Sequence, residues 1–333
     1  MKFTNLGKTG ITVSRICLGC MSYGGGEMPA WAQGTRGWHV NKEDAREHFA
    51  MALDAGINFF DTADVYSAGL SEEITGFYLK EMASRDDIVL ATKVHGVMGA
   101  GPNKRGLSRK HILEGCDNSL RRLRMDYIDL YQIHRWDETT PIEETLEALH
   151  DVIKAGKVRY IGASSMHAWR FTKALYLADN HGWSRFISMQ PQYNLMYREE
   201  EREMLPLCVA EGVGVLPWSP LARGRLAHPW TDRSSSQRFA SDAVAEALYG
   251  GTESEDRLVV DRLTEVAAQK GAPQAQVALA WVIQHPSVSS TIVGATKLKH
   301  LEDAIAALDI SLTASEKTKL EEPYLPHVWQ TPY

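Results

Sequence analysis

Short runs of apolar, β-branched or aromatic residues alternate along this chain with longer segments of helical periodicity. Each run has the length and composition of a buried strand, and together they occupy residues 15–19, 57–61, 88–93, 127–134, 158–164, 186–190, 213–218 and 291–294. Between the fourth and fifth runs, the segment PIEETLEALHDVIKAG places Ile142, Leu146, Leu149 and Ile153 on one face of a helix. The pattern therefore predicts eight strands with helices between them.

Residues typical of helix ends support this alternation. Glycines that can close a helix in the left-handed conformation precede the next strand at Gly56, Gly156 and Gly212. Residues typical of helix starts stand at Asn41, Ser71, Ser108 and Pro141. Repeated strand–helix units need parallel strands and right-handed crossovers. Because no Gly-x-Gly-x-x-Gly follows the first strand, we expect an α/β fold of the (β/α)8 TIM-barrel type, with residues 1–333 as a single domain.

Three segments depart from the repeat. The first residues, KFTNLGKTGITVS, read as a β-hairpin that precedes the barrel and plugs its bottom. Two long irregular segments, 22–40 and 221–239, follow the first and seventh strands on the side where barrel active sites are built. We expect these long loops at the C-terminal face to contact substrate and cofactor.

Composition narrows the class of partner. A formal net charge of −6 gives no electrostatic reason to expect nucleic acid or an anionic membrane. The first residues lack the apolar region of a signal peptide, and no apolar run reaches the roughly 18 residues needed to span a bilayer. A cytoplasmic protein is therefore expected, and an oligomer is compatible with the sequence.

The four cysteines are too sparse for a disulfide framework. Cys17 and Cys20 form a Cys-x-x-Cys, but residues three apart on a strand point to opposite faces, which argues against a redox pair. No second Cys-x-x-Cys and no His-Glu-x-x-His is present, so we expect no metal site.

The predicted strands end in polar or aromatic residues, which the barrel would gather at one rim: Asp61, Lys93, His134, Ser164, Gln190 and Trp218. Asp61 and Lys93, on adjacent strands, can pair, and Tyr66 follows on the loop after Asp61. An ammonium group beside a phenol stabilises the phenolate and lowers a phenol's pKa, which makes the phenol a better proton donor. Such a unit suits the reduction of a carbonyl, whose oxygen gains negative charge.

The same residues carry a family resemblance. INFFDTADVYSAGLSEEITG, VLATK, DLYQIH, YIGASSMHAW, MQPQYN, VLPWSPLARGRL and TIVGATKLKHLEDAI together resemble the aldo-keto reductase superfamily over nearly the whole chain. The segments 132–168 and 197–208 are most similar to the bacterial YajO-type, 1-deoxyxylulose-5-phosphate synthase-like reductases. The resemblance implies a (β/α)8 barrel, NADP(H) as cofactor, and a catalytic tetrad of Asp61, Tyr66, Lys93 and His134.

The resemblance also implies cofactor contacts, residue by residue. Those expected at the nicotinamide are Ser164, Gln190 and Trp218, and those along the pyrophosphate are Ser219, Leu221 and Gly224. At the adenine end they are Gly294, Thr296, His300 and Asp303. The family often clamps the 2′-phosphate with a lysine and an arginine, where this chain has Gly294 and His300. Lys297, Arg225 or Arg238 would then supply the positive charge.

Several interpretations stay open at this point. Arg135 either receives a substrate phosphate or is an ordinary surface arginine. Asp61 and Lys93, considered without the other rim residues, could also form an ion pair with a purely structural role. The acidic run YREEEREM reads as a solvated helix start without function. An NADPH-dependent carbonyl reductase is the first hypothesis. The second is a non-enzymatic, NADP(H)-sensing regulatory subunit similar to the potassium-channel β-subunits of the same superfamily.

Overall fold

Eight parallel strands form one sheet in the computed structural model, which describes residues 1–25, 29–30, 38–235 and 242–328. Their order is β10-β3-β4-β5-β6-β7-β8-β9, so neighbours in the sheet are neighbours in sequence, except where the first strand meets the last. The bounds are β3 (Ile16–Gly19), β4 (Phe59–Asp61), β5 (Val89–Val94), β6 (Ile128–Ile133), β7 (Val158–Ser164), β8 (Phe186–Gln190), β9 (Gly214–Val215) and β10 (Thr291–Gly294).

The sheet closes on itself between β9 and β10. The Ser289 N–H donates to the Val215 carbonyl at 2.9 Å, and the Ile292 N–H donates to the Pro217 carbonyl at 3.0 Å. The seventh barrel strand along the chain, β9, covers only Gly214–Val215 and is shorter than the predicted run 213–218. A physical reason is that Pro217 has no N–H to donate to a neighbouring strand. The predicted (β/α)8 barrel is confirmed.

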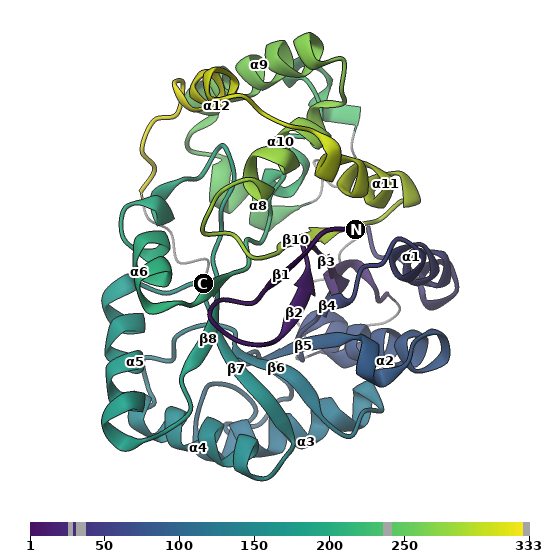
Figure 1. Cartoon of the computed structure of the whole chain (residues 1–333). Coiled ribbons are helices and arrows are strands. Elements are labelled where there is room, and N and C mark those ends of the chain that lie inside the picture. The colour runs from purple at the N-terminus through teal and green to yellow at the C-terminus, as the bar shows by residue number, and fades with distance from the viewer. Residues whose placement is uncertain (26–28, 31–37, 236–241, 329–333) are drawn as a thin grey trace.

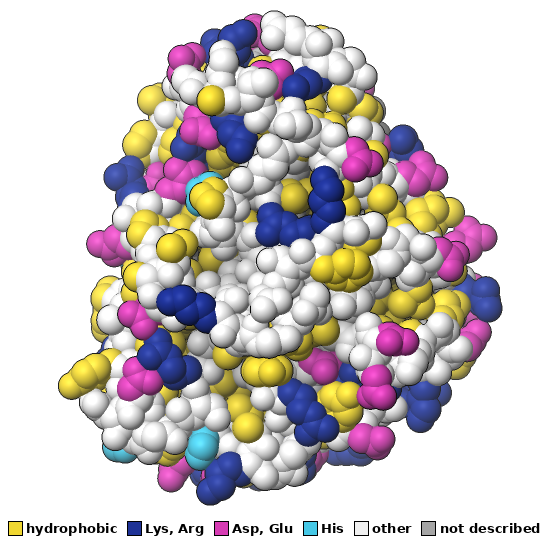
Figure 2. All heavy atoms as spheres, in the orientation of Figure 1, with side chains coloured by type: hydrophobic (Ala, Val, Ile, Leu, Met, Phe, Trp, Pro, Cys, Tyr) yellow, Lys and Arg dark blue, Asp and Glu magenta, His cyan; other side chains and the backbone are white. Residues whose placement is uncertain are grey.

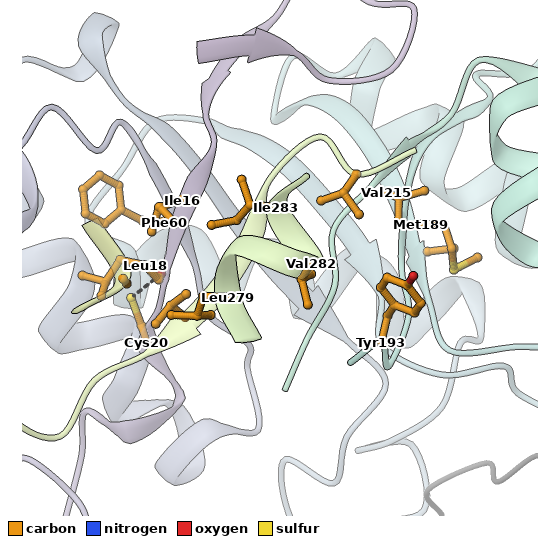
Figure 3. Packing of buried hydrophobic residues seen from close by; sticks show 14 of the residues in the cluster. Ile16, Leu18, Cys20, Phe60, Met189, Tyr193, Val215, Leu279, Val282 and Ile283 are labelled. Atoms are coloured by element: carbon orange, nitrogen blue, oxygen red, sulfur yellow. Dashed lines mark hydrogen bonds between the residues drawn. The ribbon is translucent and has the colours of Figure 1, made fainter. Parts of the chain in front are cut away.

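Helices surround the barrel, as Figure 1 shows. Their bounds are α1 (Lys42–Asp54), α2 (Leu70–Met82), α3 (Arg109–Leu123), α4 (Ile142–Lys154), α5 (Ala168–His181), α6 (Met204–Glu211), α8 (Ala243–Tyr249), α9 (Glu253–Lys270), α10 (Gln274–Ile283), α11 (Leu298–Ala306) and α12 (Ala314–Glu321). Figure 3 shows part of the core between the barrel strands and the surrounding helices, where Ile16 and Leu18 of β3 lie near Leu279 and Ile283 of α10. Burying such side chains is the main source of stability.

The hairpin expected at the N-terminus is β1 (Phe3–Asn5) paired antiparallel with β2 (Thr12–Ser14). It lies in front of the barrel strands in Figure 1. Leu6 and Val13 are fully buried and share an apolar cluster with inward-facing strand residues such as Phe59 and Leu130. The hairpin therefore plugs one end of the barrel, as predicted.

Most predicted helix ends are confirmed. The side chains of Asn41 and Ser108 accept hydrogen bonds from the first turns of α1 and α3, and Gly56, Gly156 and Gly212 have positive φ. Ser71 is the exception, because α2 begins one residue earlier, at Leu70. The Ser71 hydroxyl instead contacts the Thr62 hydroxyl at 2.8 Å and donates to the Cys20 carbonyl at 2.7 Å.

The two neighbouring cysteines lie in different parts of the core. Cys17 belongs to the cluster inside the barrel and Cys20 to the cluster between barrel and helices, and both are free thiols. On the face seen in Figure 2, acidic and basic side chains are interspersed. Among the residues that the structure describes, no helix combines the length and the hydrophobicity needed to cross a membrane.

Candidate active site

Strand alternation explains how polar groups reach the inside of the barrel. Successive side chains of a strand point to opposite faces, so residues two apart share one face. Phe59, Ala91 and Leu130 belong to the apolar cluster within the barrel. Two residues further along the same three strands come Asp61, Lys93 and Gln132. The interior thus changes from apolar to polar toward the carboxyl ends of the strands.

A buried ion pair forms the centre of this polar layer. The Lys93 Nζ donates to Asp61 Oδ1 and, at 2.7 Å, to the Thr62 carbonyl. The Lys93 side chain is 0% exposed and that of Asp61 is 3% exposed. Burial by itself lowers the pKa of Lys93, but Asp61 and Tyr66 raise it, and the net pKa lies above the ordinary value. Lys93 is therefore a cation at neutral pH.

Two glutamine amides hold the other oxygen of Asp61. The Gln190 Nε2 donates to Asp61 Oδ2 at 2.9 Å and the Gln132 Nε2 donates to it at 3.0 Å. The carboxylate therefore has partners on both oxygens, which a buried charge requires. Gln132 was not predicted from the sequence. The signal for it is a polar residue in the apolar run DLYQIH, two residues after Leu130 and therefore on the same face of the strand.

Tyr66 lies directly over this pair. It begins a short 3-10 turn, Tyr66–Gly69, in which Ser67 and Ala68 adopt the left-handed conformation with φ of 48° and 54°. The Tyr66 hydroxyl is 3.5 Å from the Lys93 Nζ. Its ring meets the His134 ring edge-on, at a centroid distance of 5.6 Å. The strained turn therefore places Tyr66 beside Lys93, Asp61 and His134, which lie at or next to the ends of their strands.

The residues expected at the nicotinamide border the same rim. The Ser164 hydroxyl donates to the Gln190 carbonyl at 2.8 Å, and the Trp218 indole N–H donates to the Ser165 hydroxyl at 3.0 Å. Arg135 lies between them, with Nη1 3.4 Å from the Ser164 hydroxyl and its guanidinium 5.9 Å from the Trp218 ring centre. The Gln190 amide N–H is directed at Asp61.

The segment after β9 carries the residues expected along the pyrophosphate. Ser219 has a φ of 51° and its carbonyl accepts from Asn194 at 2.9 Å, while Leu221 and Gly224 flank and end a short 3-10 turn. Arg225 is buried and forms ion pairs with Glu246 at 3.3 Å and Glu253 at 3.4 Å. Arg238 lies outside the described residues.

The residues expected at the adenine end surround the start of α11. Gly294 ends β10, Thr296 follows it, and Lys297 is the exposed residue that precedes the helix. The Thr296 hydroxyl and the His300 Nδ1 are 3.4 Å apart. A lysine at the positive end of a helix dipole suits an anion such as a phosphate. Asp303, by contrast, accepts from Gln276 at 2.7 Å and from Lys299 at 2.9 Å.

The acidic run after Tyr197 is not the solvated helix start that we expected. Glu199 and Glu200 are buried, at 9% and 6% exposure. Glu199 accepts from the Tyr324 hydroxyl at 2.6 Å and from the His327 backbone N–H at 3.0 Å. The run therefore anchors the segment that follows α12, a long-range contact that local sequence does not reveal.

The chain is similar in sequence to known proteins. The model of the aldo/keto reductase family matches residues 15–324. The chain is 45% identical to a versiconal hemiacetal acetate reductase of Aspergillus parasiticus, over 98% of both chains. It is 40% identical to a putative aryl-alcohol dehydrogenase of Saccharomyces cerevisiae, again over 98% of both, and 39% identical to an aldo-keto reductase of Fusarium vanettenii, over 97% of this chain and 91% of the relative. The chain belongs to the aldo/keto reductase family.

Proposed function

We propose that this protein reduces aldehydes or ketones to alcohols with NADPH and that Tyr66 is the general acid. The observation that carries the proposal is the position of Lys93, whose buried ammonium group joins Asp61 to the Tyr66 hydroxyl. A proton donor beside a fixed positive charge is what a carbonyl oxygen needs as it gains electrons. Relatives named as reductases and dehydrogenases support the same reaction class.

Each residue of the rim has a distinct role in this proposal. NADPH, when bound, supplies the hydride that the carbonyl carbon receives. Tyr66 donates its hydroxyl proton to the carbonyl oxygen, Lys93 holds positive charge beside the phenol, and Asp61 fixes Lys93. His134, edge-on to the Tyr66 ring, orients the carbonyl. Ser164 and Trp218 would border the nicotinamide.

For the cofactor, we propose NADPH over NADH. Lys297 stands exposed before α11, beside Thr296 and His300, where the N-terminal N–H groups of the helix also favour negative charge. Arg225 is a weaker candidate for the 2′-phosphate because it already pairs with Glu246 and Glu253. Two charge-assisted hydrogen bonds to the phosphate would give roughly a hundredfold preference.

For the substrate, two classes follow from the rim. The ring of Trp218, whose centre lies 5.9 Å from the Arg135 guanidinium, suits an aryl aldehyde. The Arg135 guanidinium, near Ser164, suits the phosphate of a phosphorylated sugar, which is the substrate class implied by the YajO-type resemblance. We propose the aryl aldehyde first, since one relative is named as a putative aryl-alcohol dehydrogenase.

The test is a panel of aryl aldehydes, ketones and sugar phosphates, each followed by loss of NADPH absorbance and repeated with NADH. Turnover of at least one aryl aldehyde, with a clear preference for NADPH, is the expected result. Tight NADPH binding without turnover of any carbonyl would favour the regulatory-subunit alternative. Equal affinity for the two cofactors would contradict the proposed preference.

A further inference from the structure

A polar cavity lies outside the rim, close to the start of the turn that carries Tyr66. It has a volume of about 60 Å³, lies between Asp64 and α3, and is open to solvent on the side of Lys104 and Glu114. Asp64, two residues before Tyr66, lines it, together with His111, Glu114 and Arg122 of α3 and with Lys104. The residues of the tetrad do not line it, so the cavity is distinct from the proposed reaction site.

Asp64 connects this cavity to the Tyr66 turn. Its Oδ1 accepts from the Val65 N–H at 2.6 Å, and its own N–H donates to the Lys93 carbonyl at 3.2 Å. Asp64 is 1% exposed, and its Oδ2 has no hydrogen-bond partner among the described residues. Across the cavity, the Nε2 of buried His111 also lacks a described partner.

The charges that face Asp64 come from several elements. Glu72 of α2 is fully buried and is held by Thr92 at 2.5 Å and by Arg122 at 2.6 Å, so that arginine already serves another carboxylate. His111, Lys104 and Glu114 complete the lining. Burial and, next, Glu72 raise the pKa of Asp64 to about 8, while Arg122 and the backbone N–H groups of Val65 and His95 oppose the shift.

We propose that Asp64 is a positioning residue for Tyr66. As a neutral carboxylic acid, Asp64 holds the turn by accepting the hydrogen bond from the Val65 N–H. The inference rests on the proposed role of Tyr66. Ionised Asp64 would place a second negative charge beside Glu72, and Arg122, which opposes the shift, already pairs with Glu72. A buried charge without a counter-charge of its own is strongly unfavourable. Relief of this repulsion moves the ionised carboxylate away from Glu72 and from the Val65 N–H. The turn then loses its fixed position, and proton donation by Tyr66 slows.

The experiment compares wild type with Asp64→Asn, Asp64→Ala and Tyr66→Phe, and uses Glu114→Gln as a control at the cavity lining. Single-turnover reduction of an aryl aldehyde is followed from about pH 6 to about pH 9.5 at saturating NADPH. Asp64→Ala should be about tenfold slower, with NADPH affinity within about threefold, because the Val65 contact is lost. Asp64→Asn, whose amide resembles the neutral acid, should react about as fast as wild type at low pH. Its rate should show no inflection near pH 8, whereas the rates of wild type and Glu114→Gln should both show one.

Denaturant unfolding supplies a second readout that does not use activity. A carboxyl group whose folded pKa is raised stabilises the protein at low pH, and that contribution is lost as pH rises to about 8. The unfolding midpoint of wild type should therefore fall relative to Asp64→Asn between about pH 5 and about pH 9. If Tyr66→Phe is inactive but wild type and Asp64→Asn show the same dependence of rate and of unfolding midpoint on pH, this inference alone is overturned. A fully active Tyr66→Phe overturns both the proposed function and the inference.

Discussion

Lys93 decides how the polar residues of the rim are arranged. A fully buried ammonium group needs partners, and Asp61, the Thr62 carbonyl and Tyr66 surround it. The sequence predicted the Asp61–Lys93 contact because strand ends gather at one rim of a barrel. It did not predict Gln132 or Asp64, since which buried polar group satisfies another depends on side-chain directions across strands.

Asp61→Asn should destabilise the protein by about 3–5 kcal/mol at neutral pH, because it leaves Lys93 buried without a counter-charge. In wild type the pKa of Lys93 is raised above its ordinary value of 10.5. The buried ammonium group and its partners therefore stabilise the folded protein below about pH 10.5, and this contribution is lost at higher pH. In the variant, burial dominates and lowers the pKa of Lys93, so the deficit should shrink as pH rises toward about 10. Denaturant unfolding at two pH values measures this, with exposed Asp54→Asn as control. A deficit that does not change with pH would contradict it.

At the scale of elements, local signals predicted helix ends better than long-range contacts. Asn41 and Ser108 cap helices as expected because a cap needs only neighbouring N–H groups. Ser71 does not, because Gly69 with φ of 98° already turns the chain, and α2 then begins at Leu70. The acidic run at Glu199 looked solvated because its partners, Tyr324 and His327, lie more than a hundred residues away.

Glu199→Ala should loosen the segment that follows α12. The loss of the Tyr324 and His327 contacts should cost about 1–3 kcal/mol, whereas exposed Glu203→Ala should have little effect. Burial raises the pKa of Glu199, but hydrogen bonds from Tyr324, Arg202 and His327 lower it below its ordinary value of 4.5 overall. The stabilisation is therefore present above that pH and is lost as pH falls. Limited proteolysis near Tyr324 reports the change. Equal cleavage rates for the two variants would refute the anchoring role.

For the whole molecule, the eight-strand alternation was enough to predict the barrel, because each strand–helix unit constrains its neighbour. The sequence also placed the hairpin, but not how closely it approaches the barrel. Gly7 has φ of 59°, and a Cβ there would lie 2.4 Å from the Gly212 carbonyl oxygen. No side chain longer than hydrogen fits that contact without displacing the plug.

Gly7→Ala should therefore destabilise the whole barrel by about 1–3 kcal/mol through backbone strain and the displaced plug. Gly10 lies in the same hairpin, and a Cβ there would meet nothing within 4 Å, so Gly10→Ala is the matched control. Thermal unfolding of both variants tests the prediction. If Gly10→Ala lowered the melting temperature as much as Gly7→Ala, the close approach would not be the cause.

The central claim is that Tyr66 gives the proton, and Tyr66→Phe tests it most directly because it removes one oxygen and keeps the ring. Single-turnover reduction of an aryl aldehyde and NADPH affinity should be measured on the same preparation. We expect the rate to fall by a factor of about 10² to 10⁴, with NADPH affinity within a few-fold of wild type. A Tyr66→Phe protein that reduces the aldehyde at close to the wild-type rate would contradict it.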